Sequence, residues 1–363
     1  MRIATIVGNR PQFVKAAAVS KRLRTTHEEL IVHTGQHYDD LLSRVFFDEL
    51  GVPPPDRQLG AASGTNTAQT ARILAELEPH LEELDPDLVL VYGDTSSTLA
   101  GAIAAAQASR PVAHVEAGMR SGDRSMPEEL NRVLCDHASD LLLCSTPTAV
   151  ANLEHEGIRA GVHLVGDVMA DVSLTFASVA RERSRALEEH DLVEGEYVLV
   201  TAHRAGNVDP RARLRALVEL LEALPLPAVF PIHPRTDARL RAAGLRERLE
   251  AAPRLRPIPP VGYLDFLALL RGAGAVLTDS GGVQKEAYLL ATPCVTMRPS
   301  TEWVETVEAG WNELVDLDAD AAVAALARAV DGEVAVRPRP DLYGAGRAAE
   351  RIGDLLDSYT PAR

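Results

Sequence analysis

The chain has 363 residues, of which 46% are hydrophobic, and a formal net charge of −15, a length that suits about two domains. The acidic balance argues against nucleic acid or an anionic membrane surface as a partner, and no apolar run approaches the ~20 residues that span a bilayer. With no leader-type apolar segment at Met1 and three widely spaced cysteines that fit no metal motif, we expect a cytoplasmic protein without a bound metal.

Short apolar strands alternate with longer amphipathic helices along the whole chain, which is typical of parallel sheets covered by helices. The predicted strands are 3–7, 30–34, 88–92, 112–115, 141–144 and 162–165, followed by 197–201, 229–232, 255–258, 275–278 and 294–297. The clearest predicted helices are 66–84, 99–108, 177–190, 212–223, 283–290 and 347–356. We predict an α/β fold with two doubly wound, Rossmann-like domains, 1–166 and 167–344, and a hinge near Gly166. The C-terminal helix within 345–363 is expected to rejoin the first domain.

In such sheets ligands bind at the carboxyl ends of the strands, so the polar residues that follow each strand are the candidates for a site. The first of these turns carries Arg10 and Lys15, which could converge on a phosphate at a helix start, or could be two solvated cations. The turn lacks the G-x-G-x-x-G pattern, so a dinucleotide is disfavoured and we expect no cofactor.

Acidic side chains follow the next strands in order. Asp94 comes after the strand 88–92, Glu116 after 112–115, and Glu128 opens a helix on the same face as Arg132. Each alone could be a helix cap or a surface partner. Several carboxylates along one sheet edge fit general acid–base chemistry better, because close carboxylates can raise one another's pKa.

The second half places basic side chains at equivalent points. His203 and Arg204 follow one strand, and His233 and Arg235 follow another. A lone histidine is more often structural than catalytic, but two such pairs supply the positive charge that an anionic substrate would need in an acidic protein. No H-E-x-x-H metal motif and no G-x-S-x-G nucleophile motif occurs.

The stretch from Ala275 to Glu286 predicts a strand, a tight turn at Ser280, Gly281 and Gly282, and a helix N-terminus. Free backbone N–H groups and the positive helix end make such a corner an anion site. Glu286, about one turn later, could accept hydrogen bonds from a ribose diol, which together with a phosphate would describe a nucleotide. The alternative is a helix cap at Ser280 with a dipole-stabilising glutamate.

Taken together, these motifs resemble the non-hydrolysing UDP-N-acetylglucosamine 2-epimerases over nearly the whole chain. The segments that carry the resemblance are Gly8–Pro11, Gly93–Thr95, His114–Gly118, Pro127–Arg132, Ala202–Arg204, Asp279–Gln284 and Thr301–Glu302. The resemblance implies a glycosyltransferase-B architecture, in which two Rossmann-like domains flank an interdomain cleft, and a homodimer that acts on a UDP-amino sugar without a cofactor.

The resemblance also implies roles for individual residues. The expected catalytic residues are Asp94, Glu116, Glu128 and His203. The expected substrate-binding residues are Arg10, Lys15, Arg132 and His233, with Tyr263 beside the uracil, Ser280, Gly281 and Gly282 on the diphosphate, and Glu286 on the ribose. The implied reaction interconverts UDP-N-acetylglucosamine and UDP-N-acetylmannosamine by elimination of UDP, through a 2-acetamidoglucal, and its re-addition.

Three alternatives stay open at this point. The segment Thr301-Glu-Trp-Val-Glu305 and the segment Val32–Asp39 resemble the branch that acts on UDP-2,3-diacetamido-2,3-dideoxy-glucuronate. A glycosyltransferase of the same fold would instead transfer the sugar to an acceptor, and a nucleotide-sugar sensor would bind UDP without turnover. Activation by a second UDP-sugar is not expected, because two of the three positions that it uses, near Gln36, Asp39 and Ala205, differ from activated enzymes.

Overall fold

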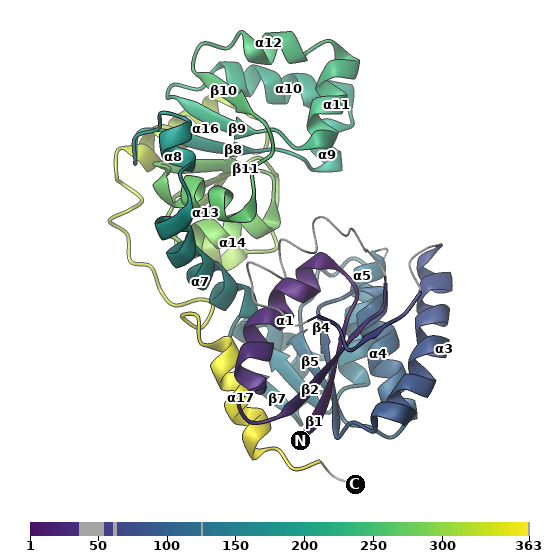
Figure 1. Ribbon diagram of the computed structural model, residues 1–363. Coiled ribbons are helices and arrows are strands. Elements are labelled where there is room, and N and C mark those ends of the chain that lie inside the picture. Colours follow the sequence, from purple (N-terminus) through teal and green to yellow (C-terminus); the bar gives the residue numbers. More distant parts are fainter. Residues whose placement is uncertain (36–53, 61–63, 125, 362–363) are drawn as a thin grey trace. The chain divides into compact units, whose positions relative to one another are not determined.

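The structure of the protein is a computed structural model, which describes residues 1–35, 54–60, 64–124 and 126–361 (Figure 1). The chain forms two compact units. Unit 1 consists of Met1–Val172 and Leu342–Arg363, and unit 2 consists of Ser173–Asp341. No helix in the described part of the chain combines the length and apolar character that crossing a bilayer requires.

Unit 1 is built on a seven-stranded parallel sheet in the order β3-β2-β1-β4-β5-β6-β7. Its strands are β1 (Arg2–Val7), β2 (Glu28–His33), β3 (Arg57–Gln58), β4 (Leu88–Tyr92), β5 (Val112–Ala117), β6 (Leu141–Cys144) and β7 (Val162–Leu164). The helices are α1 (Arg10–Leu23), α3 (Asn66–Leu84), α4 (Ser96–Gln107), α5 (Pro127–His137), α6 (Pro147–His155), the start of α7 (Val168–Arg183) and α17 (Ala348–Ser358).

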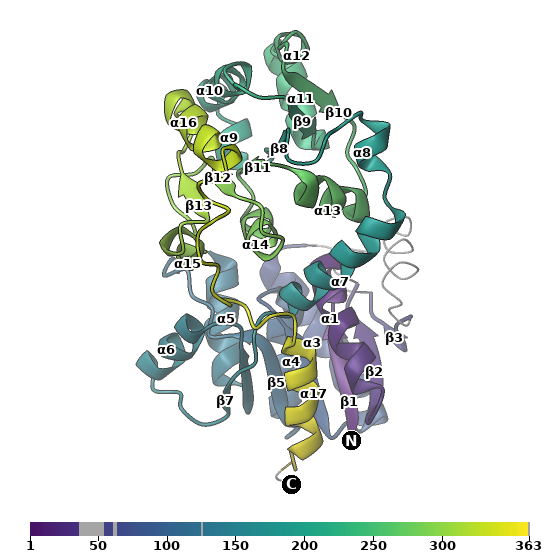
Figure 2. The same ribbon diagram turned by 90° about the vertical axis from the view of Figure 1, so that its left-hand side faces the viewer.

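Successive residues of the unit 1 strands point to opposite faces of the sheet, and each face buries its own layer of helices. On one face, Ile3, Leu88 and Leu90 pack with α1 and α17. On the other, Ala4 and Val89 pack with α3 and α4. Figure 2, turned from Figure 1, shows α17 running alongside the other elements of this unit, where Arg22 of α1 forms ion pairs with two aspartates of α17.

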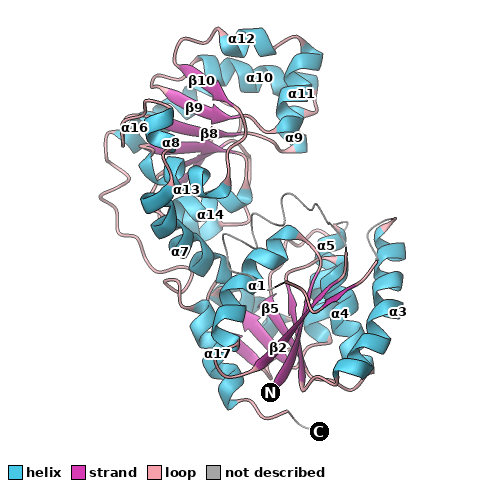
Figure 3. Ribbon diagram, viewed as in Figure 1, coloured by secondary structure: helices cyan, strands magenta, loops and turns pink. Residues whose placement is uncertain are grey.

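Unit 2 repeats the same design with six parallel strands in the order β10-β9-β8-β11-β12-β13. Figure 3 shows β8, β9 and β10 side by side among the helices of this unit. Its strands are β8 (Val198–Thr201), β9 (Ala228–Pro231), β10 (Leu255–Ile258), β11 (Ala275–Thr278), β12 (Cys294–Thr296) and β13 (Asn312–Leu314). Its helices are α8 (Ala186–Glu189), α9 (Ala205–Val208), α10 (Arg211–Glu222), α11 (Pro234–Ala243), α12 (Arg246–Glu250), α13 (Tyr263–Gly272), α14 (Gly281–Leu289), α15 (Val304–Glu308) and α16 (Ala319–Val330).

Both sheets follow the Rossmann strand order, in which the chain leaves the first strand in one direction and later returns to add strands on the other side. The reversal falls between β1 and β4 in unit 1 and between β8 and β11 in unit 2. The predicted α/β class with two doubly wound sheets is therefore confirmed. Ligands of such sheets bind beside the reversal, at the carboxyl ends of the strands. We therefore expect the residues of a site at these two places.

The predicted single helix 177–190 is wrong. The structure has two helices there, α7 from Val168 and the short α8 from Ala186. Ser184 separates them because its hydroxyl donates to Asp265 at 2.6 Å and accepts from the Ala186 amide. Two edge strands, β3 and β13, were not predicted, because two or three residues carry too little apolar pattern to mark a strand.

Candidate active site

The carboxyl edge of the unit 1 sheet brings together Lys15 and Glu116, which the sequence places 101 residues apart. Lys15 comes from α1, after β1, and Glu116 lies near the end of β5; their side chains form a direct ion pair. Burial lowers the pKa of Lys15, but the charge and hydrogen bond of Glu116, with the charge of Asp94, outweigh burial and raise it. Lys15 is therefore a fixed cation, and it lies beside two of the predicted acids.

Asp94 carries a second ion pair at the same edge. Its carboxylate accepts from Arg132 of α5 at 2.5 Å, and its backbone carbonyl accepts from the Asn131 side chain at 2.8 Å. Asp94 does not cap α4, because the hydroxyl of Thr95 caps that helix by accepting from the Thr98 amide. The carboxylate of Asp94 is thus held by a side chain from α5 and not by the helix that follows it.

Arg132 pairs with Glu129 rather than with the predicted Glu128. Its guanidinium donates to Glu129 at 3.1 Å, and Glu129 also accepts from the amides of Ser121 and Gly122. Glu129 is buried, and these donors hold its pKa below the usual range even though burial raises it. Glu128 is exposed in the first turn of α5, and no ion pair or hydrogen bond joins it to another described residue.

Glu116 has a backbone φ of +69°, in the left-handed region that side chains other than glycine rarely adopt. The register between β5 and β6 shifts at this point, where Val115 and Ala117 pair with consecutive residues of β6. Such a bulge re-aims the side chain of the extra residue. Strained backbone that the surrounding sheet holds in place is commonly found at functional sites, which makes Glu116 a stronger candidate than its sequence position alone does.

Gln12 joins the two turns on either side of the strand reversal. Its side-chain amide donates to the Tyr92 carbonyl at 2.7 Å and to the Thr98 hydroxyl at 2.9 Å, and its oxygen accepts from the Gly8 amide at 2.7 Å. A Cβ on Gly8 would lie 2.0 Å from the Ser97 hydroxyl oxygen, so only glycine fits. Arg10 begins α1, and its side chain lies outside the part of the chain that the structure describes, as do Gln36 and Asp39.

The corresponding edge of unit 2 brings His203 and His233 together. Their ring centroids are 5.4 Å apart, so the two histidines that follow β8 and β9 are neighbours. Asp279, fully buried after β11, accepts from the backbone amides of His203 at 3.0 Å and Arg204 at 3.0 Å. Burial, with the charges of His203 and Arg235, lowers the pKa of His233.

The turn before α14 leaves its backbone amides open to an anion. Ser280 occupies the N-cap position without a side-chain cap, and Gly281 and Gly282 begin the helix. A Cβ on Gly281 would lie 2.4 Å from an oxygen of Glu302, whereas a Cβ on Gly282 would meet nothing closer than the Ser280 hydroxyl at 3.9 Å. The space above Gly282 therefore suits the close approach of an oxyanion to the helix N-terminus.

Glu286 lies five residues beyond Gly281 and is buried. The Tyr263 hydroxyl donates to its carboxylate at 2.9 Å, which ties α13 to α14. Burial raises the pKa of Glu286 to about 7, and the Tyr263 hydrogen bond and the charge of Lys285 only partly oppose it. A carboxyl group this desolvated gains from further donors, such as the two hydroxyls of a ribose.

Several residues that organise the site were not predicted as functional. They are Asp279, Gln12, His114, Glu129 and Asp136, all of them buried polar side chains. A weak signal existed for Asp279, because it directly follows an apolar strand, where a buried carboxylate must find donors. No local pattern separates Glu129 from Glu128, since only the packing of α5 decides which one faces Arg132.

Two Rossmann-type sheets, each with charged side chains gathered where its strand order reverses, define a double α/β protein of the kind that binds nucleotide-containing ligands. A family profile described as UDP-N-acetylglucosamine 2-epimerase matches residues 21–357. The chain belongs to this family, and it is therefore an isomerase of the epimerase type.

Individual relatives agree with the family assignment. A Pseudomonas aeruginosa protein named UDP-2,3-diacetamido-2,3-dideoxy-D-glucuronate 2-epimerase is 46% identical over 98% of this chain and 99% of its own length. A Methanocaldococcus jannaschii UDP-N-acetylglucosamine 2-epimerase is 40% identical over 98% of this chain and 99% of its own. The crystal structure of the M. jannaschii UDP-GlcNAc 2-epimerase in complex with UDP-GlcNAc and UDP superposes with a TM-score of 0.83 at 39% identity, covering 99% of this chain and 100% of that one.

Proposed function

We propose that this protein interconverts UDP-N-acetylglucosamine and UDP-N-acetylmannosamine by eliminating UDP and adding it back. The observation that carries the proposal is the pair of carboxylates at the unit 1 edge, Glu116 held by Lys15 and Asp94 held by Arg132. Inversion at C2 needs one group to remove a proton and another to return one on the opposite face, and two positioned acids can supply both.

The chemistry follows from the substrate. No carbonyl adjoins C2 within the sugar ring, so its hydrogen is not acidic enough for direct removal. A base therefore takes the C2 proton while the bond between C1 and the phosphate oxygen breaks, which gives UDP and a 2-acetamidoglucal with a C1–C2 double bond. The phosphate oxygen then attacks C1 as a proton arrives at the other face of C2. Lys15 and Arg132 would hold the acids in place through both steps.

Unit 2 is proposed to hold UDP throughout. The open amides at Gly281 and Gly282 suit the diphosphate, since a helix N-terminus favours negative charge. The carboxyl group of Glu286 would accept from the ribose, with Tyr263 beside the uracil. His203 and His233 would stabilise the phosphate as it leaves. Unit 1 would then act as the catalytic domain and unit 2 as the UDP-binding domain.

A second candidate substrate is UDP-2,3-diacetamido-2,3-dideoxy-glucuronate, through the same reaction. The relative named for that activity is more similar over the full length, at 46% identity, than the M. jannaschii relative named for UDP-N-acetylglucosamine, at 40%. Sugar transfer to an acceptor, as in a glycosyltransferase, is the weaker alternative, because it gives no role in proton transfer to Asp94 and Glu116.

Incubating the protein with each UDP-sugar separately in deuterium oxide tests the proposal. We expect UDP-N-acetylmannosamine to form from UDP-N-acetylglucosamine, with deuterium at C2 of both sugars. Epimerisation of the diacetamido uronate alone would move the assignment to the second candidate. Formation of free UDP and sugar without any 2-epimer would contradict both.

We also propose a cytoplasmic homodimer, on the family resemblance alone. Sedimentation equilibrium should then give twice the mass of one chain, whereas a single-chain mass at micromolar concentration would argue against the dimer.

A further inference from the structure

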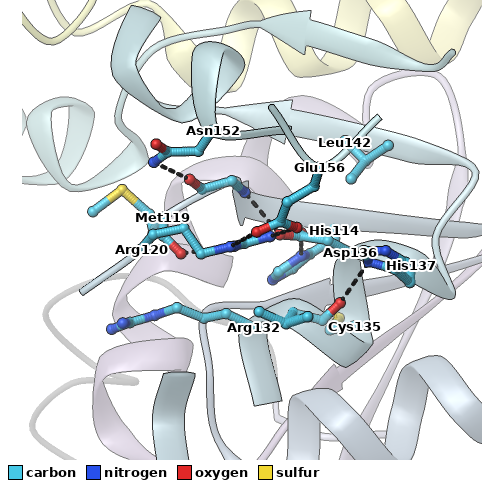
Figure 4. Close-up of polar contacts among 12 residues, drawn as sticks. His114, Met119, Arg120, Arg132, Cys135, Asp136, His137, Leu142, Asn152 and Glu156 are labelled. Atoms are coloured by element: carbon cyan, nitrogen blue, oxygen red, sulfur yellow. Dashed lines mark hydrogen bonds and ion pairs between the residues drawn. The ribbon is translucent and has the colours of Figure 1, made fainter. Parts of the chain in front are cut away.

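His114, on β5 two residues before Glu116, has both ring nitrogens in short contacts while its side chain is fully buried. Nε2 lies 2.7 Å from the carbonyl oxygen of Gly93. Nδ1 lies 2.7 Å from a carboxylate oxygen of Asp136, and Figure 4 shows His114 beside Asp136. Gly93 directly precedes Asp94. The ring therefore lies between the turn that carries one proposed acid and the helix α5.

The partners of the ring fix its protonation. A carbonyl oxygen can only accept, so Nε2 must carry a proton. The second oxygen of Asp136 accepts from the Gly118 amide at 3.0 Å and lies 2.8 Å from the Arg120 guanidinium. These donors hold Asp136 as a carboxylate, which leaves Nδ1 as the donor in its contact with Asp136. Both ring nitrogens are then protonated, and the ring is an imidazolium.

The charged and titratable groups around the ring agree with this state. Cys135 and Asp136 on α5 act on the ring directly, and Glu116 lies two residues further along β5. Arg120, after β5, contacts Asp136, and Glu156, directly after α6, accepts from Arg120 at 2.7 Å. Burial lowers the pKa of His114, but Cys135 and Asp136 raise it by more, to well above the ordinary value. Burial likewise raises the pKa of Asp136, and His114 and Arg120 together hold it below its usual range.

We propose that His114 is a positioning residue: a doubly protonated imidazolium that fixes the Gly93–Asp94 turn against α5 and places a constant positive charge on β5, two residues from Glu116. This inference rests on the proposed roles of Asp94 and Glu116. The hydrogen bond from His114 to the Gly93 carbonyl fixes the position of the turn that carries Asp94. The positive charge of the ring favours the carboxylate form of a base in a half-buried site. The loop after β5, which contacts Asp136, is held to α6 and its end: Asn152 of α6 donates to the Gly118 carbonyl at 2.9 Å, and Arg120 pairs with Glu156.

The competing account is a neutral histidine that shares a proton with a protonated Asp136 and only fills space. The two accounts predict different protonation of the ring, on both nitrogens or on only one. Long-range ¹⁵N–¹H spectra of the whole protein, labelled at histidine and recorded at pH 8, report the state of each ring nitrogen. We expect both nitrogens of His114 to show bound protons and imidazolium-type shifts at this pH. One nitrogen without a proton would overturn the proposal.

The assignment of the His114 signals comes from their loss in His114→Gln, with His155→Gln as a control because His155 is exposed on α6. If His114→Gln does not fold, contacts of the ring protons with the Gly93 and Gly118 amides in the wild-type spectrum assign them. The protonation state is measured without any substrate. The protonation of His114 and the proposed epimerase reaction are therefore tested separately. A wild-type protein without turnover would contradict the reaction but not the protonation of His114.

The kinetic test uses the same two variants. In His114→Gln we expect the acid limb of the pH profile of kcat/KM to move upward by about one pH unit, because a neighbouring positive charge is lost. Binding of UDP, measured by calorimetry, should stay within twofold of wild type, and His155→Gln should match wild type in both. A lower kcat at every pH with an unmoved acid limb would mean that His114 only supports the fold, and would overturn the proposal.

Discussion

At the scale of single residues, the site depends on how each acid is paired. Asp94 and Glu116 each contact one cation from a different element, Arg132 of α5 and Lys15 of α1. A positioned cation holds a carboxylate in a defined rotamer. Both acids are also partly exposed at the sheet edge, with 29% and 16% of their side-chain surface accessible, so a substrate can reach them.

The amide substitution Asp94→Asn keeps the shape of the side chain but removes its charge and its basicity. We expect kcat/KM for epimerisation to fall by at least about 100-fold, since general acid–base catalysis contributes that much or more. The affinity for UDP, measured by calorimetry, should be unchanged, because the proposed UDP site lies in unit 2.

Asp85→Asn is a matched control, because Asp85 is an exposed aspartate in the left-handed conformation that asparagine tolerates. It should retain wild-type turnover. If Asp94→Asn were as active as this control, Asp94 would have no part in proton transfer.

Glu286 links protonation to stability. Its pKa in the folded protein, about 7, lies above that of an unfolded glutamate, so the folded state binds more protons between about pH 4.5 and 7 and stability falls as the pH rises through that range. Glu286→Gln removes the penalty. We expect the free energy of unfolding of the variant, relative to wild type, to be higher at pH 8 than at pH 5 by about 2 kcal/mol.

Denaturant titration at the two pH values measures this difference. The exposed Glu308 of α15 supplies the control, and Glu308→Gln should give the same relative stability at both. A Glu286→Gln variant with no pH-dependent gain would show that the Glu286 carboxyl group is not desolvated in the folded protein. The same variant should weaken UDP binding if Glu286 accepts from the ribose.

At the scale of elements, the site depends on the turns that end β4 and β5. Gly118, directly after β5, has a φ of +76°, and a Cβ there would lie 2.3 Å from the Ala149 carbonyl oxygen in α6. Gly122 has a similar φ of +74°, but a Cβ there would meet no atom within 4 Å. The two glycines share the backbone requirement, and only Gly118 has the close approach to α6.

Gly118→Ala should therefore destabilise the protein more than Gly122→Ala does. The left-handed conformation alone costs about 1–2 kcal/mol in each variant, and the contact with Ala149 should add at least about 1 kcal/mol to Gly118→Ala. Thermal and denaturant unfolding measure the difference. Equal losses in the two variants would mean that the loop moves away from α6 without penalty.

The sequence predicted the elements with a strong apolar pattern and missed those without one. The strands 88–92, 141–144 and 275–278 were predicted at their observed bounds, as was the helix 66–84. The strand 255–258, whose apolar pattern is weak, was also predicted at its observed bounds. Predicted helix 99–108 began three residues late, because the capping by Thr95 and Thr98 depends on side-chain geometry that an apolar count does not detect. Edge strands as short as β3 carry no periodicity at all.

The sequence placed several candidate acids and histidines at the sheet edges but did not predict their pairings. The acids and histidines follow strands, so the rule of carboxyl ends placed Asp94, Glu116, His203 and His233 at the sheet edges. Which cation meets which acid depends on long-range packing, as the 101-residue separation of Lys15 and Glu116 shows. The role of each residue in catalysis stays a prediction that the variants above can test.

At the scale of the whole molecule, the same Rossmann strand order occurs twice, once per unit, with different chemistry at each reversal. Unit 1 offers carboxylates in ion pairs, and unit 2 offers open amides and histidines. This division matches a reaction in which one part of the protein moves a proton and the other holds an anion that leaves and returns. Because the chain has a net charge of −15, an anionic substrate depends on the local cations in both places to be attracted to the site.

The central claim is that the bond between C1 of the sugar and the phosphate oxygen breaks and reforms in every turnover. Positional isotope exchange tests it most directly, with UDP-N-acetylglucosamine that carries ¹⁸O in the bridge between C1 and the β-phosphorus. If UDP is released from the sugar within the site, the β-phosphate rotates, and the account predicts that label appears in its non-bridging oxygens as the 2-epimer forms. Formation of the 2-epimer with all of the label still in the bridge would contradict the account.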